Sequence, residues 1–77
     1  MISHSQIEEL KLLSQFSIDS TQTGIKVHTN EAPETTVAAA QRLFDKGLTD
    51  QVDGGYLTER GVEAAVHAQG LMNLLAD

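Results

Sequence analysis

The apolar residues of this 77-residue chain are dispersed, and this dispersal limits the folds that are open to it. The longest unbroken apolar run covers only residues 37–40, whereas a membrane-spanning helix needs about 20 consecutive apolar residues. The N-terminus lacks the basic start and the apolar stretch of a signal peptide, and the chain has no cysteine for a disulfide framework. We therefore expect one small cytoplasmic domain, without a membrane segment, whose core is assembled from short amphipathic elements.

Local signals predict a helix, a loop and a strand in the first third of the chain. Ser5 and Glu8 fit the Ser-x-x-Glu capping box, so a helix is expected over 5–16. Polar residues over 19–24 indicate a loop, and the alternation over 25–28 is typical of a short half-buried strand. The helix is expected to bury a stripe made of Ile7, Leu10, Leu12, Leu13 and Phe16.

A second helix is predicted over 33–46, between a proline and a glycine. Pro33 suits the first turn, where its missing N–H costs nothing, and Gly47 can end the helix in the left-handed conformation. Leu48 can then fold back on the helix, as in a Schellman motif. The expected buried face consists of Val37, Ala40, Leu43 and Phe44.

A hairpin is predicted over 50–58. Asp53-Gly54 or Gly54-Gly55 supplies the positive φ angles that a tight turn needs. Val52 and Leu57, on its two strands, are expected to face inward.

A third helix over 59–75 completes the order, and Thr58 is expected to cap it. The fold class is therefore α+β, with a single domain over 1–77. Its order is helix–strand–helix–β-hairpin–helix, with a two- to three-stranded sheet. The inward face of the third helix is expected to hold Val62, Ala65, Val66 and Met72.

The C-terminal half resembles the winged-helix domains of MarR-like and PadR-like transcriptional regulators. A Leu-x-x-x-Gly-Leu step over 43–48 ends one helix, and a Leu-Thr-x-x-Gly step over 57–61 opens the next. The resemblance implies a small winged-helix-like domain, in which the second helix takes the place of the recognition helix and the hairpin that of the wing. The chain departs from that pattern because only four residues separate the strand from the second helix, and because the wing carries Asp50 and Asp53 but no cation.

Over its whole length the chain also resembles a family of short, acidic, functionally uncharacterised bacterial proteins. This resemblance supports the fold and implies no activity. The shared pattern is Thr-Gly-Ile-Lys-Val-His at 23–28, Lys-Gly-Leu at 46–48, Gln-Val-Asp-Gly-Gly-Tyr-Leu-Thr at 51–58, Glu-Ala-Ala at 63–65 and His-Ala-Gln at 67–69.

Acidic residues outnumber basic ones, and this balance limits the partners of the protein. Eleven Asp and Glu residues against five Lys and Arg residues give a net charge of −6. Proteins that bind DNA commonly neutralise roughly 6–10 phosphates with basic side chains, so nucleic acid is an unexpected partner. A DNA-binding transcriptional regulator is the alternative function, and it would need four cations on one face: Lys26, Arg42, Lys46 and Arg60.

No pattern of reactive side chains indicates an enzyme, a metal site or a cofactor. The three histidines follow no ligand spacing such as His-x₃-His, and no cysteine accompanies them. A calcium loop around 49–61 would lack the glutamate at its twelfth position, and neither a phosphate-binding glycine loop nor a Gly-x-Ser-x-Gly elbow is present. We therefore expect no catalytic residue, no metal, no cofactor and no small-molecule ligand.

The last turns of the third helix are apolar on almost every side. Leu71, Met72, Leu74 and Leu75 cannot all reach the core of so small a domain. Either the first helix covers most of them, or they form a surface for self-association.

These residues lead to the functional hypothesis of a non-enzymatic protein-interaction module. We expect it to bind a protein partner and to pair with a second copy of itself through the third helix. Ala68 and Gly70 would allow close contact between two helices. Tyr56 on the hairpin is a further candidate for the contact, or it packs against Leu48 as part of the core.

Overall fold

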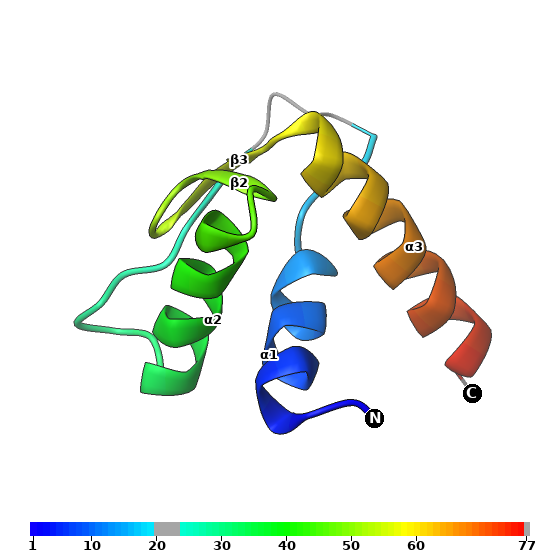
Figure 1. Ribbon diagram of the computed structural model, residues 1–77, viewed down its shortest axis with the longest axis horizontal. Coiled ribbons are helices and arrows are strands. Elements are labelled where there is room, and N and C mark those ends of the chain that lie inside the picture. Colours follow the sequence, from blue (N-terminus) through cyan, green and yellow to red (C-terminus); the bar gives the residue numbers. More distant parts are fainter. Residues whose placement is uncertain (20–23, 77) are drawn as a thin grey trace.

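The protein folds into three helices and a small sheet, and their order confirms the expected α+β fold (Figure 1). The computed structural model describes residues 1–19 and 24–76. The predicted loop over 19–24, and Thr23 of the family pattern, fall mainly outside the described residues. The elements are α1 (His4–Leu13), β1 (Ile25–Lys26), α2 (Glu34–Asp45), β2 (Thr49–Gln51), β3 (Gly54–Leu57) and α3 (Glu59–Leu75).

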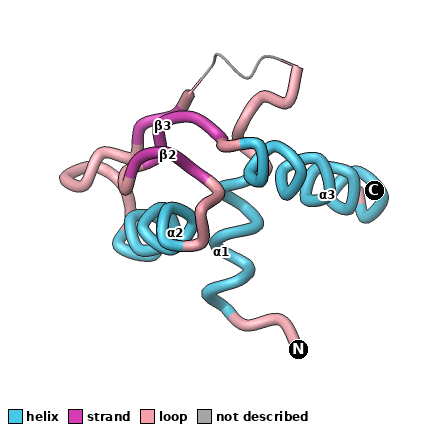
Figure 2. Tube along the Cα trace, turned by 45° about the horizontal axis from the view of Figure 1, so that its top comes forward, coloured by secondary structure: helices cyan, strands magenta, loops and turns pink. Residues whose placement is uncertain are grey.

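The strands form one antiparallel sheet in the order β1-β3-β2. The central strand β3 pairs Gly55 with Ile25 on one side and Leu57 with Thr49 on the other. The sheet lies at one end of the helices, next to α2, and α3 runs away from it toward the C-terminus (Figures 1 and 2). Both termini therefore lie away from the sheet.

The hairpin turn lies earlier in the chain than predicted. β2 ends at Gln51 and β3 begins at Gly54, so Val52 and Asp53 form the turn. Neither has a positive φ, whereas Gly54 and Gly55 have φ angles of 120° and 73°. The two glycines follow the turn, where the register between the strands is irregular. Val52 was predicted to face inward, but at the tip of the turn it is exposed.

The cap of α1 lies two residues earlier than predicted. Ser3 Oγ accepts a hydrogen bond from the Gln6 N–H at 3.1 Å, and Gln6 Oε1 accepts one from the Ser3 N–H at 2.9 Å. This capping box has the same form as the one expected at Ser5 and Glu8. α1 also ends three residues before the predicted end, because the following N–H groups bond to carbonyls three residues back and tighten the chain.

The junction between α2, the hairpin and α3 confirms the prediction. Gly47 has a φ of 78°, and the N–H groups of Gly47 and Leu48 donate to carbonyls of the last turn of α2 at 3.0 and 2.9 Å, as in a Schellman motif. Thr58 caps α3, because its Oγ1 accepts from the Gly61 N–H at 3.0 Å. A Cβ on Gly61 would collide with the Leu48 carbonyl oxygen. Glycine at 61 therefore lets α3 pack directly against the backbone that follows α2.

The side of α3 that faces the core consists of small residues. α3 buries Gly61, Ala65 and Ala68, whereas Val66 and Met72, both predicted to face inward, are 47% and 41% exposed. The close approach at Gly61 explains the difference, because a helix that packs through its backbone leaves room only for small side chains. The large apolar residues of α3 consequently point away from the core.

The core lies where the three helices meet, with the sheet closing one end. Phe44 of α2 was also predicted to be buried, but it is 41% exposed, because α2 turns its alanine side to α1. Val37 and Leu57, at the edge of the core, are half-buried. The buried apolar residues are Leu12, Leu13, Phe16, Val27, Ala39, Ala40, Leu43, Ala65 and Ala68.

Candidate interaction surface

The C-terminal half of α3 presents large apolar side chains to solvent. Leu74 and Leu75 are 85% and 71% exposed, and Leu71 and Met72 are 48% and 41% exposed. The sequence left two alternatives for these side chains, cover by the first helix or a surface for self-association. Because they are exposed, α1 does not cover most of them. Of the two small residues expected to allow helix contact, Ala68 is buried in the core, whereas a Cβ on Gly70 would meet open space.

The N-terminus adds two more exposed apolar side chains, Met1 and Ile2. Both line the same hollow as Leu71 of α3, so they belong to one surface. We call this surface the apolar end. It comprises Met1, Ile2, Leu71, Met72, Leu74 and Leu75.

The apolar end is built from the two uncharged stretches at the ends of the chain. Residues 1–7 and 64–76 contain no Asp, Glu, Lys or Arg, although the chain has a net charge of −6. The charged side chains therefore come from the intervening sequence and from Asp77. A second molecule that docks on these two stretches meets no Asp, Glu, Lys or Arg side chain from them.

An open groove of about 700 Å³ adjoins the apolar end. Its walls come from α1, the end of α2 and α3, and Figure 1 shows α1 and α3 diverging toward the termini. Gln6, Glu9, Lys46 and His67 supply polar atoms to this lining. The apolar walls are formed by Met1, Ile2, Leu10, Leu13, Leu43, Leu48, Ala64, Ala68 and Leu71.

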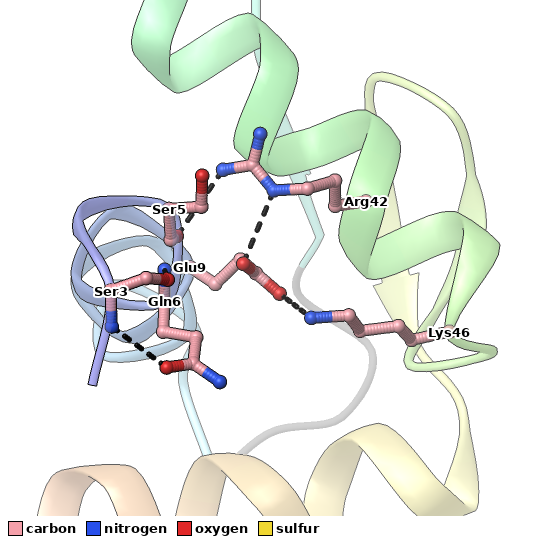
Figure 3. A network of polar contacts seen from close by, with 6 residues as sticks. All are labelled: Ser3, Ser5, Gln6, Glu9, Arg42 and Lys46. Atoms are coloured by element: carbon pink, nitrogen blue, oxygen red, sulfur yellow. Dashed lines mark hydrogen bonds and ion pairs between the residues drawn. The ribbon is translucent and has the colours of Figure 1, made fainter. Parts of the chain in front are cut away.

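A buried carboxylate holds one wall of the groove together (Figure 3). Glu9 of α1 is only 6% exposed, and it accepts hydrogen bonds from Arg42 Nε at 3.1 Å and from Lys46 Nζ of the α2 cap. Arg42 also donates to the Ser5 carbonyl at 3.2 Å. Burial would raise the pKa of Glu9, but the hydrogen bonds and charges of Lys46 and Arg42 outweigh it and hold that pKa below its ordinary value. The cluster ties α1 to α2 and leaves α3 outside it.

The four cations proposed for nucleic acid do not form one free basic face. Arg42 and Lys46 share Glu9, and Lys26 pairs with Asp53. The hydrogen bond from Lys26 lowers the pKa of Asp53. Arg60 lies in the first turn of α3 and is exposed. Three of the four cations are thus already matched by carboxylates of the same chain.

Tyr56 lies on a different part of the molecule from the apolar end. Tyr56 belongs to β3, at the opposite end of the molecule from the termini, and is 45% exposed, so the fold does not bring it to the apolar end.

His4, His28 and His67 are exposed, and among residues 1–19 and 24–76 no three His, Cys, Asp or Glu side chains gather as metal ligands would. Within the same ranges, no helix is long and apolar enough to cross a membrane.

Comparison with known sequences assigns the chain to a family. Residues 1–76 match the model of a family of unknown function, DUF5669. The chain belongs to this family. No curated protein and no solved structure matches the chain. The expected relation to an uncharacterised family is therefore confirmed, and membership of DUF5669 assigns no activity to the groove or to the apolar end.

The sequence of this DUF5669 protein indicated the exposed leucines at the end of α3. It did not indicate the contributions of Met1, Ile2 and Glu9, or the groove. Residues 1–7 and 64–76 both lack Asp, Glu, Lys and Arg, and this shared feature could have indicated that the two stretches form one surface. Glu9 could not be recognised as buried, because a carboxylate in the first turns of a helix is usually solvated. The groove depends on the angle between α1 and α3, which no local pattern encodes.

Proposed function

We propose that this protein is a non-enzymatic interaction module that pairs with a second copy of itself through the apolar end. The observation that carries the proposal is the exposure of Leu74 and Leu75 on the uncharged end of α3. Contiguous apolar side chains exposed on a folded protein mark interaction surfaces. Small domains also often gain stability by association, because their own cores are limited.

The energetics favour a weak pair. Fully burying a leucine or methionine side chain is worth about 1.5–3 kcal/mol, and a two-fold pair buries each side chain twice. The four large side chains of α3 are already partly covered, so their burial supplies on the order of 10 kcal/mol. Association costs about 4–15 kcal/mol in lost freedom. We therefore expect a dimer that dissociates on dilution.

As part of this proposal, the protein has no catalytic function and is located in the cytoplasm. Its support is the sequence, which lacks a nucleophile elbow, a phosphate-binding loop, a ligand-spaced set of histidines and any cysteine. The open groove suits a docking partner better than a reaction, because two of the three ionisable side chains in its lining, Glu9 and Lys46, are engaged with one another and only His67 is left beside them.

A winged-helix DNA-binding regulator remains the alternative function. The order helix–strand–helix–hairpin–helix agrees with it, but phosphate contacts need cations that are free to face the duplex. Lys26, Arg42 and Lys46 each pair with a carboxylate, and the net charge is −6. These observations favour the interaction module.

The test compares two substitutions of exposed apolar residues by light scattering after gel filtration. Leu74→Glu places a charge in the apolar end, whereas Val52→Glu places the same charge in the hairpin turn, where Val52 is 46% exposed. At a loading where the wild type exceeds its monomer mass of 8.3 kDa, we expect Leu74→Glu to return to that mass and Val52→Glu to behave as the wild type. A Leu74→Glu protein with unchanged mass would overturn the proposal.

A further inference from the structure

The molecule exposes more surface than a monomer of its size usually does. Its accessible surface is 5292 Å², whereas the scaling law for monomeric proteins gives ~4,600 Å² for 8.3 kDa. Its radius of gyration of 11.7 Å is close to the ~11.5 Å expected for 77 residues, so elongation does not explain the difference. The excess of roughly 700 Å² is near the ~800 Å² that each partner buries in a standard interface.

Large exposed apolar side chains gather where α3 departs from the body of the protein. The Gln69 side chain donates to the Phe16 carbonyl in the turn after α1, and Ala65 and Ala68 are buried, so α3 is held against the body of the protein as far as residue 69. Beyond that point a Cβ on Gly70 would meet nothing within 4 Å, and the remaining turns of α3 diverge from α1 (Figure 1). The groove begins before this point and opens toward the divergence, because α3 contributes Ala64, His67, Ala68 and Leu71 to its walls.

We propose that the last turns of α3 of one copy occupy the groove of a second copy, and that the second copy returns the same contact. The occupant of the groove is thus residues 71–75 of another molecule of this chain. This inference rests on the proposed function, because it specifies how the apolar end pairs. A reciprocal contact of this kind closes as a two-fold dimer and leaves no further surface for growth.

The chemistry of the groove fits this occupant. Its apolar walls match the leucines, and neither residues 64–76 nor residues 1–7 bring a charged side chain to the contact. The C-terminal end of a helix carries a partial negative charge, and α3 has no basic residue in its last turn to offset it. Lys46 at the rim of the groove is half exposed, and its ammonium has further donors beyond the one that binds Glu9. Arg42 and Lys46 are two cations against the single carboxylate of Glu9, so this cluster keeps a net positive charge beside the groove that can face the end of α3.

Paramagnetic broadening between two copies tests the arrangement. The chain has no cysteine, so Asn73→Cys carries a single nitroxide label on the exposed side of α3. Labelled chains of natural isotope content are mixed with unlabelled ¹⁵N chains at a concentration where sedimentation shows association. We expect the amide signals of Leu10, Leu48 and Ala64 in the ¹⁵N chains to lose more than half of their intensity relative to the reduced label. A label at Gln51→Cys, on the hairpin, is the control and should leave them unchanged.

The outcomes separate the two proposals. Association without broadening at the groove residues, or broadening confined to the outer side of α3, would overturn reciprocal docking and leave the interaction module standing. A monomer mass at every concentration would overturn both.

Discussion

Removing the charge of Glu9 should destabilise the fold in a pH-dependent way. The Glu9 side chain is 8% exposed and accepts from two cations, whereas the Arg42 and Lys46 side chains are 31% and 50% exposed. A hydrogen bond to a charged group is worth about 1.5–3 kcal/mol, but half-exposed cations are screened by water and contribute less. Glu9→Gln keeps the shape and one oxygen acceptor. We therefore expect it to lower the free energy of unfolding by about 1–2 kcal/mol at pH 7.

The pH dependence follows from the direction of the pKa shift. The pKa of Glu9 lies below its ordinary value of 4.5 in the folded protein, because the hydrogen bonds from Lys46 and Arg42 outweigh the effect of burial. The stabilisation is thus fully present above about pH 4.5 and is lost as the pH falls through the folded-state pKa. Gln does not titrate, so the difference in unfolding free energy between wild type and Glu9→Gln should shrink below pH 4.5.

Urea unfolding followed by circular dichroism at pH 7 and at low pH measures both effects. Glu8→Gln is the matched control, because Glu8 is on the same helix but pairs with Lys11 at 3.4 Å on the surface. We expect that control to change the unfolding free energy by less than about 0.5 kcal/mol. Equal costs for the two substitutions at pH 7, or a Glu9→Gln cost that does not fall with pH, would refute the reasoning.

Further predictions concern packing and nucleic acid. Gly61→Ala should lower the unfolding free energy by about 1–3 kcal/mol in urea titrations, because its Cβ meets the Leu48 carbonyl oxygen, while Gly70→Ala, in open space, should raise it by up to about 1 kcal/mol at low protein concentration. Equal changes in unfolding free energy for the two substitutions would contradict the close approach of α3 to the chain after α2. Leu43→Ala removes a side chain that is 1% exposed and should cost about 2–5 kcal/mol in the same titrations. Fluorescence polarisation with random duplex DNA at low salt should show no binding at tens of micromolar, and saturable binding would restore the DNA-binding alternative.

The elements that sequence predicted well are those fixed by local chemistry. The helix stop at Gly47 and the Thr58 cap on Gly61 each rest on hydrogen bonds within a few residues, so the end of α2 and the start of α3 follow from the sequence alone. The start of α1 was misplaced because Ser3 with Gln6 and Ser5 with Glu8 offer two overlapping capping boxes. Local chemistry allows both, and the structure has the one at Ser3 and Gln6.

The candidate surface was only partly predictable for a related reason. The excess of leucines at the end of α3 is visible in the sequence, but which stripe of α3 faces the core is not. Val62 and Val66 form as good an apolar stripe as Ala65 and Ala68. The small stripe is buried because Gly61 brings the α3 backbone against the chain after α2, and this contact joins residues that are distant in sequence.

Sedimentation equilibrium of the wild-type protein tests most directly whether the apolar end is an interface between two copies. From about 1 μM to 1 mM, the weight-average mass should rise from 8.3 kDa toward twice that value and then level off. A mass that stays at 8.3 kDa over the whole range would contradict the account.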